Sequence, residues 1–178
     1  MTWVQSVPVS PIGEQRQQQV CAATEACLRR AGEICRYPFP AIEISFDLNG
    51  RAAGMYRVRQ GRRCIRYNPY ILTRYFNEGL AETVPHEVAH YATDVLFGLG
   101  NIRPHGLEWQ ALMHALGATP RATARYDLTG IPVRRQRRFS YRCGCTIHQL
   151  SSQRHNRIHR GSAAYICRRC KVPLVFAG

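Results

Sequence analysis

Hydrophobic positions in the first part of the chain change from a helical to a strand-like spacing. Over residues 13–35, apolar side chains recur at helical intervals in an otherwise polar stretch, which predicts an amphipathic helix with one buried face. Over residues 41–48 they alternate with polar side chains, as in a half-buried strand, and Asn49-Gly50 is typical of a hairpin turn. Residues 52–59 and 63–67 predict two further strands. We therefore expect a three-stranded antiparallel sheet that packs against helices, in an α+β fold.

The pattern becomes helical again after Asn68-Pro69. Residues 70–76 predict a short helix, and a longer helix is expected from Glu78 onward. Pro85 lies within this longer pattern and cannot donate a backbone hydrogen bond. The long helix therefore either begins close to Pro85 or is kinked there, and the sequence does not distinguish the two.

The sequence His-Glu-x-x-His at residues 86–90 carries the first candidate chemistry. Residues four apart lie on one face of a helix, so His86 and His90 can bind the same zinc ion. Glu87 points about 100° away, where it can reach a water molecule instead of the metal. The spacing indicates a metalloprotease site with Glu87 as its catalytic residue. The alternative is an ordinary helix that carries these three residues by chance.

A third zinc ligand is expected beyond the loop at 98–104, which is rich in Gly, Asn and Pro. His105 follows this loop at the start of a helical pattern, and we expect it to complete a site of three histidines. Other side chains compete for this role. They are Glu108, Asp94 and His114. Asp94, one turn after His90, is also a candidate for orienting an imidazole ring.

Composition indicates a folded chain without a membrane anchor. The 178 residues are 45% hydrophobic, which suits one domain with a small appendage. No run of about 18 uncharged apolar residues occurs, as a membrane-spanning helix requires. Residues 1–11 lack the basic and then apolar pattern of a signal peptide. We expect a cytoplasmic protein with no membrane partner, associated with the nucleoid if its source is bacterial.

Charge is concentrated at the C-terminal end. The chain carries a net charge of +14, and residues 131–178 contain ten Arg, Lys171 and no Asp or Glu. A general preference for Arg over Lys does not account for the missing carboxylates. A basic segment without acids is typical of proteins that bind nucleic acids or other polyanions.

The eight cysteines fall into two groups. Four are scattered among apolar residues and are expected to be small buried side chains; these are Cys21, Cys27, Cys35 and Cys64. The other four form two pairs, Cys143-x-Cys145 and Cys167-x-x-Cys170, which can supply the four thiolates of a structural zinc site. The first pair has one intervening residue where two to four are usual, so His148 is an alternative ligand. Bound metal would supply folding energy to this short segment.

The histidine and cysteine motifs together resemble the SprT family. They are His86-Glu-Val-Ala-His90, His105-Gly-Leu-Glu-Trp109, Tyr141-Arg-Cys-Gly-Cys145 and Tyr165-Ile-Cys-Arg-Arg-Cys170. That family includes bacterial SprT proteins and the protease domain of eukaryotic Spartan, and the similarity extends from about Ile12 to Phe176. The resemblance implies zincin-like helices, a catalytic zinc on His86, His90 and His105, and Glu87 as acid/base. It also implies cleavage of proteins crosslinked to DNA, as in the eukaryotic relatives.

The expected partner is DNA, single-stranded and bound without sequence preference. Arg154, Arg157 and Arg160 recur every third residue between the two cysteine pairs, and Tyr141, Tyr165 or Phe139 could stack on bases. The residues expected to contact DNA are Arg134, Arg135, Arg137, Arg138, Arg154, Arg157, Arg160, Arg168 and Arg169. The protein substrates are then those that lie on DNA.

These expectations define four segments and leave two rival functions. We expect a flexible tail (1–12), a SprT-like metalloprotease domain (13–130), a basic linker (131–140) and a zinc ribbon (141–178), with one catalytic and one structural zinc ion. The first rival is a zinc- and DNA-binding protein without protease activity. The second is a regulator linked to transcription. Glu87 favours the enzyme, because a purely structural metal site does not need it.

Overall fold

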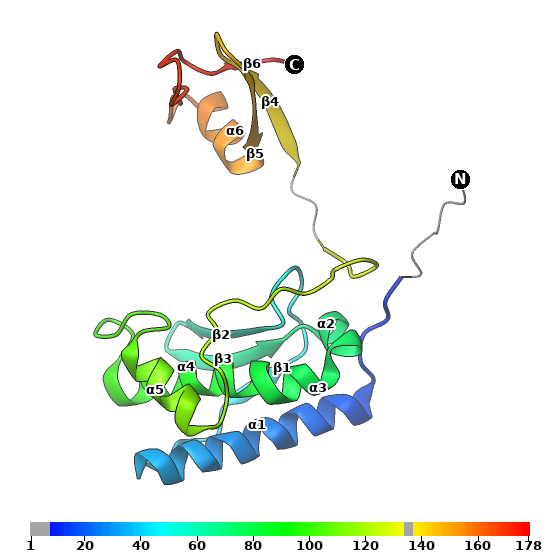
Figure 1. Cartoon of the computed structure of the whole chain (residues 1–178), viewed down its shortest axis with the longest axis vertical. Helices are drawn as coiled ribbons and strands as arrows, with labels where there is room; N and C mark the ends of the chain where they lie inside the picture. Colours follow the sequence, from blue (N-terminus) through cyan, green and yellow to red (C-terminus); the bar gives the residue numbers. More distant parts are fainter. Residues whose placement is uncertain (1–7, 134–136) are drawn as a thin grey trace. The chain divides into compact units, whose positions relative to one another are not determined.

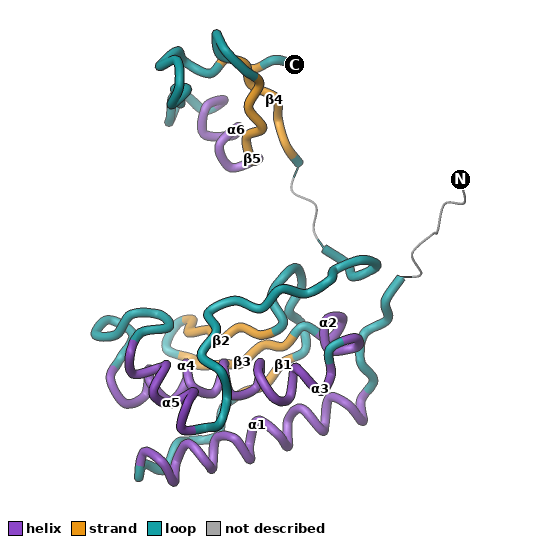
Figure 2. Tube along the Cα trace, viewed as in Figure 1, coloured by secondary structure: helices purple, strands orange, loops and turns teal. Residues whose placement is uncertain are grey.

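The computed structural model describes residues 8–133 and 137–178, which belong to two compact units divided between Val133 and Arg134 (Figures 1 and 2). The first unit contains, in order, α1 (Glu14–Cys35), β1 (Glu43–Ser45), β2 (Gly54–Arg59), β3 (Arg62–Tyr67), α2 (Pro69–Arg74), α3 (Phe76–Glu78), a π-helical turn (Gly79–Thr83), α4 (Val84–Phe97) and α5 (Leu107–Ala115). The second contains β4 (Arg138–Arg142), β5 (Ile147–Ser151), α6 (Ser152–His159) and β6 (Val175–Phe176).

The first unit is layered around α4, which lies between α1 and the sheet (Figure 1). Val84, Val88 and Ala92 recur along α4 at helical spacing and are buried, so this helix has a continuous apolar face. Tyr67 of β3 packs in the same core, where its hydroxyl meets Thr24 Oγ1 of α1 at 2.9 Å. A helix buried on several sides is held rigidly, which suits it to carry reactive side chains.

The α+β class and the three strands of the first unit are confirmed, but one pairing differs from the prediction. The strand order is β1-β3-β2; β2 and β3 form the expected antiparallel hairpin, whereas β1 is parallel to β3. The expectation of a wholly antiparallel sheet was therefore wrong for β1. Asn49-Gly50 does not close a hairpin. The loop that contains it is held by Asn68, whose side chain donates to the carbonyl oxygens of Gly50 and Ala52, each at 3.2 Å.

The question raised by Pro85 has a definite answer. The α-helix begins at Val84, so Pro85 lies in its first turn, the part of a helix that accepts proline best. The chain before it is also helical, as the π-helical turn leads directly into α4. Turns of this kind occur often at functional sites.

Part of the predicted tail and linker is packed. Ile12 is buried and its N–H donates to the Pro69 carbonyl, while Val9 N–H donates to Gly130, so residues 8–12 are not a loose tail as predicted. Residues 1–7 of that tail lie outside the described residues. At the other end, Ile131 is buried in the first unit and β4 begins at Arg138. The predicted linker at 131–140 is therefore shorter than expected at both ends.

The second unit is a small antiparallel sheet with one helix. Its strand order is β5-β4-β6, and α6 follows β5 directly. Among its described residues, Tyr141, Leu150 and Cys167 are buried. Tyr141 Oη meets His155 Nδ1 at 3.0 Å. Tyr141 is only 1% exposed, so it belongs to the core of this unit and is not available to stack on a base, contrary to the prediction.

Two further findings concern the whole described chain. None of the helices in residues 8–133 and 137–178 has the length and apolar character needed to cross a bilayer. The scattered cysteines are half-buried rather than fully buried as predicted, and Cys27 and Cys35 pack at the margin of the core.

Candidate metal centres

Three imidazoles converge in the first unit. The Nε2 atoms of His86, His90 and His105 form a triangle with sides of 3.1 to 3.2 Å. Three ring nitrogens this close cannot all be paired by hydrogen bonds, so their lone pairs are directed at a common point. Zinc–nitrogen bonds of about 2.0–2.1 Å in a tetrahedron would set the nitrogens about 3.3 Å apart. The triangle fits that requirement.

The electrostatics of the three rings suit metal binding. Burial, with a contribution from His105, lowers the pKa of His86 to about 4. Burial and the two neighbouring rings lower the pKa of His90 to about 3, and burial also lowers the pKa of His105. The imidazoles are therefore neutral at pH 7, which is the state that coordinates a metal.

His105 is presented by a strained turn. Its φ is +57°, in the left-handed region, where histidine is found more often than most residues. Gly106 follows because a Cβ there would lie 2.8 Å from the Arg103 carbonyl oxygen, to which Gly106 donates through its N–H. This explains why glycine follows the histidine. Gln110 of α5 then donates to the His105 carbonyl oxygen at 2.9 Å and holds the turn to the helix.

Trp109 packs against all three histidine rings. It is 2% exposed, and its ring centroid lies 4.8 Å from His86, 5.5 Å from His90 and 4.7 Å from His105. Its Nε1 donates to the His86 carbonyl oxygen at 3.2 Å. One side chain of α5 therefore contacts all three candidate ligands, a role that its place in the motif did not reveal.

Glu87 lies beside this cluster and is buried. Burial raises its pKa to about 8, against a lowering by the N–H of Tyr56, which donates to Oε2 at 2.6 Å. Glu87 and His86 line a cavity of about 320 Å³ whose other wall includes the segment from Thr119 to Tyr126. A substrate in this cavity could therefore reach the Glu87 carboxyl group and His86.

Of the four candidates for the third ligand, His105 is the one that lies beside His86 and His90. Glu108 and His114 are exposed and lie outside the histidine group. Asp94 is 3% exposed and accepts hydrogen bonds from Tyr56 Oη at 2.5 Å, Arg63 Nε at 2.7 Å and Leu99 N at 3.0 Å. Its carboxylate thus ties the loop after α4 to the sheet, and no hydrogen bond joins it to an imidazole among the described residues.

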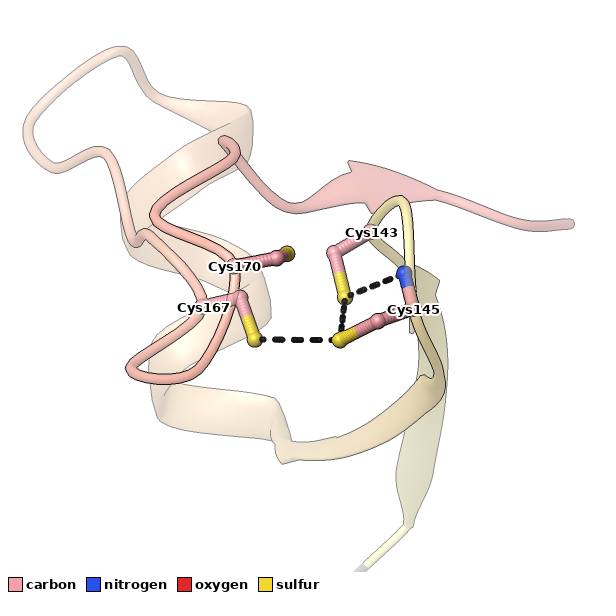
Figure 3. A group of neighbouring side chains, drawn as sticks. All are labelled: Cys143, Cys145, Cys167 and Cys170. Carbon is pink, nitrogen blue, oxygen red and sulfur yellow. Dashed lines mark hydrogen bonds between the residues drawn. The ribbon is translucent and has the colours of Figure 1, made fainter.

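In the second unit the four paired cysteines converge (Figure 3). Cys143 and Cys145 lie in the turn between β4 and β5, and Cys167 and Cys170 in the loop before β6; all four Sγ atoms lie within 4.8 Å of one another, and none is in a disulfide. Zinc–sulfur bonds of about 2.3 Å would set tetrahedral sulfurs about 3.8 Å apart. The Cys145–Cys167 distance of 3.7 Å fits this spacing.

His148 lies at the edge of the cysteine cluster. Its Nε2 is 3.3 Å from Cys143 Sγ, so it remains an alternative ligand to one cysteine. The backbone N–H of Cys145 donates to the Cys143 sulfur at 3.4 Å (Figure 3). This hydrogen bond is the largest of the effects that lower the pKa of Cys143 to about 5. A thiolate at Cys143 is the form that binds metal.

The arginines expected to contact DNA lie mostly on exposed parts of the second unit. Arg154 and Arg157 are on α6 and Arg160 follows it, so the three occupy about a third of the helix circumference. The remaining described candidates are also exposed; they are Arg137, Arg138, Arg168 and Arg169. Arg134 and Arg135 lie outside the described residues. The structure brings the aromatic ring of Phe139 against His155, at a centroid distance of 3.7 Å and nearly parallel.

The fold and its two clusters define an α+β protein with a candidate three-histidine metal site and a zinc ribbon. The chain belongs to the SprT-like family, whose model matches residues 24–137, and the SprT-like zinc ribbon domain matches residues 137–178. It is a zinc-binding member of that family. No solved structure matches the chain significantly.

Curated relatives cover most of the chain. Protein SprT of Pseudomonas paraeruginosa is 39% identical over 160 residues, which are 88% of this chain and 93% of that protein. Protein SprT of Vibrio parahaemolyticus is 36% identical over 153 residues (85% and 88%), and Protein SprT of Shewanella oneidensis is 35% identical over 162 residues (90% and 99%). The resemblance drawn from the motifs is therefore confirmed.

Proposed function

We propose that this chain is a zinc-dependent, DNA-associated metalloprotease that hydrolyses peptide bonds of proteins bound or crosslinked to DNA. The observation that carries this proposal is the triangle of Nε2 atoms together with the buried Glu87, since Glu87 and one member of the triangle, His86, line the same cavity. A site that only stabilised the fold would need neither the open cavity nor the carboxylate.

His86, His90 and His105 would hold the catalytic zinc, and the four cysteines would hold a structural one. The bound catalytic ion supplies Lewis-acid polarisation of the scissile carbonyl and activation of a water molecule. Glu87 would act as the acid/base of the site, accepting a proton from the attacking water and delivering it to the leaving amine nitrogen. Trp109 keeps the imidazoles in place and excludes water from their far side, since its ring contacts all three.

The basic second unit supports DNA as the partner. It has no carboxylate side chain, so no arginine in it can be neutralised by an acid of the same unit. Arg154, Arg157 and Arg160 present guanidinium groups to solvent, which suits contacts to phosphates without base reading. Of the predicted aromatic side chains, Tyr165 and Phe139 are half-buried and could stack on unpaired bases, as could the exposed Phe176.

The test is proteolysis by the wild type and by Glu87→Gln, each with and without single-stranded DNA. We expect the wild type to cleave itself or a DNA-bound protein, with stimulation by DNA, and Glu87→Gln to be inactive while it keeps its zinc. If both are inert, bind DNA equally and hold only the ribbon zinc, the protease assignment fails and a non-proteolytic zinc- and DNA-binding role is left.

A further inference from the structure

The free edge of strand β2 lies against the carboxylate of Glu87. We propose that Gly54 and Tyr56 of β2 are positioning residues for Glu87, Gly54 by leaving space for its carboxylate and Tyr56 by binding it. This proposal rests on the proposed function, because it concerns the residue that would move the proton. It adds to the proposed function two residues that belong to neither metal site and to none of the sequence motifs.

Tyr56 supplies the bond. In the order β1-β3-β2 the strand β2 is at the edge, and the backbone N–H of Tyr56 donates to Glu87 Oε2 at 2.6 Å. A hydrogen bond from a strand backbone fixes an oxygen more firmly than a mobile side chain does, because the strand is held along its length by its neighbour. Glu87 is 5% exposed, so few water molecules compete for this bond.

The side chain of Tyr56 anchors the same strand to the same helix. Its hydroxyl donates to Asp94 Oδ2 at 2.5 Å, and Asp94 lies seven residues after Glu87 on α4. Seven residues are two helical turns, or about 10.5 Å. Tyr56 is therefore hydrogen-bonded to α4 at two points, through its backbone N–H at Glu87 and through its hydroxyl at Asp94. The two contacts together fix the position of β2 along the helix.

Gly54 supplies the space. A Cβ built on Gly54 would lie 2.6 Å from Glu87 Oε1, 2.7 Å from Glu87 Cγ and 2.7 Å from Thr83 Cγ2. A Cβ atom essentially never lies within 3.0 Å of such atoms, so any side chain at this position must displace Glu87 and Thr83. The φ of Gly54 is not in the left-handed region, so the backbone itself does not require glycine. Glycine is needed here because of the close approach of Glu87.

The decisive variant is Gly54→Ala, with Gly13→Ala as its matched control. Gly13 also has no left-handed φ, and nothing lies within 4 Å of the Cβ that alanine would add there. We expect Gly54→Ala to lower kcat at least tenfold while KM and zinc content stay close to wild type, and to lower the unfolding temperature without unfolding the protein, because the added methyl group also meets Thr83. Gly13→Ala should leave kcat unchanged. A wild-type kcat in folded, zinc-loaded Gly54→Ala overturns the proposal.

A measurement that does not depend on proteolysis keeps the two proposals apart. Amide hydrogen exchange of Tyr56, followed by NMR, should be slow in the wild type and at least tenfold faster in Glu87→Ala, which removes the acceptor. Exchange at the same rate in both proteins overturns the positioning role even if the protein is a protease. If the wild type cleaves nothing but exchange changes as expected, the proposed function fails and the contact stands. This measurement also decides the matter should Gly54→Ala not fold.

Discussion

The indole Nε1 of Trp109 donates a hydrogen bond to the backbone carbonyl oxygen of His86, at 3.2 Å. This carbonyl belongs to the first turn of α4, which carries His86 and His90, and the donor comes from α5, which directly follows the turn that carries His105. The same indole is stacked on His90 with an angle of 29° between the rings. The position of α5, and hence of the His105 turn before it, therefore depends on Trp109.

Trp109→Phe should separate the hydrogen bond from the packing. It keeps an aromatic ring against the imidazoles and loses the donor, so we expect a loss of about 1 kcal/mol in the free energy of unfolding. Trp109→Ala should cost about 3–5 kcal/mol, because it leaves a cavity in the core. Urea unfolding of both variants measures this. Equal losses for the two would show that the ring contributes nothing beyond its hydrogen bond.

Replacement of Asp94 should destabilise the first unit. Asp94 accepts bonds from Tyr56, Arg63 and Leu99, and Asp94→Asn removes the charge that makes two of them strong. We expect a loss of about 2 kcal/mol in the free energy of unfolding. Asp47→Asn is the matched control, since Asp47 also pairs with an arginine, Arg66, but is 63% exposed. Its loss should stay below about 1 kcal/mol.

The contribution of Asp94 should also depend on pH. Burial alone would raise the pKa of Asp94, but the hydrogen bonds from Arg63 and Tyr56 hold it below its ordinary value. A carboxyl with a lowered folded-state pKa stabilises the fold above its unfolded pKa of about 3.9 and loses that effect as the pH falls through the folded-state value. The difference in unfolding free energy between wild type and Asp94→Asn should be constant from pH 7 to about pH 5 and shrink below about pH 4. A difference that grows on acidification would contradict this assignment.

The sequence predicted the helices and the side chains that converge in the candidate metal centres better than it predicted the contacts between strands and helices. His86 and His90 are four residues apart in one helical pattern, which the sequence shows directly. The loop before His105 is rich in helix-breaking residues, which indicates that the chain turns back there. These residues could therefore be identified without a structure. The direction of β1 could not be predicted from the sequence. Asn49-Gly50 favours a hairpin locally, but Asn68, almost twenty residues later, holds that loop in another conformation.

Gly54 and Tyr56 were missed for a related reason. Their roles depend on how β2 packs against α4, and the spacing of apolar residues along the sequence does not reveal this packing. A glycine within a strand pattern is a signal of a close backbone approach, and it could have drawn attention to Gly54, but it does not say what approaches. Tyr141 shows the opposite error. An aromatic residue in a basic segment suggests base stacking, yet this unit is so small that it needs the ring for its core.

Zinc content should distinguish the two metal centres. We expect two zinc ions per wild-type chain, and one in His105→Ala, because two imidazoles alone bind zinc weakly. Cys170→Ser should also hold one, and its second unit should lose its fold because the metal supplies folding energy there. Mass spectrometry of purified protein gives the stoichiometry. His114→Ala is the control for histidine loss, since His114 is exposed and outside the histidine group, and it should keep both ions.

Loss of three arginines from α6 should weaken DNA binding in a salt-dependent way. For single-stranded DNA, each phosphate contact contributes about 0.7 to the slope of log affinity against log salt concentration. Replacing Arg154, Arg157 and Arg160 by Gln should therefore reduce the magnitude of that slope by about 2.

The matched control has the same change in net charge at another place. Arg29, Arg30 and Arg36 are exposed at the end of α1, in the first unit, and their replacement by Gln should leave the slope almost unchanged if the second unit makes the phosphate contacts. Fluorescence anisotropy with a labelled oligonucleotide, at several salt concentrations, measures both variants. Equal effects of the two triple substitutions would mean that DNA responds only to the net charge of the chain, and the assignment of binding to the arginines around α6 would be wrong.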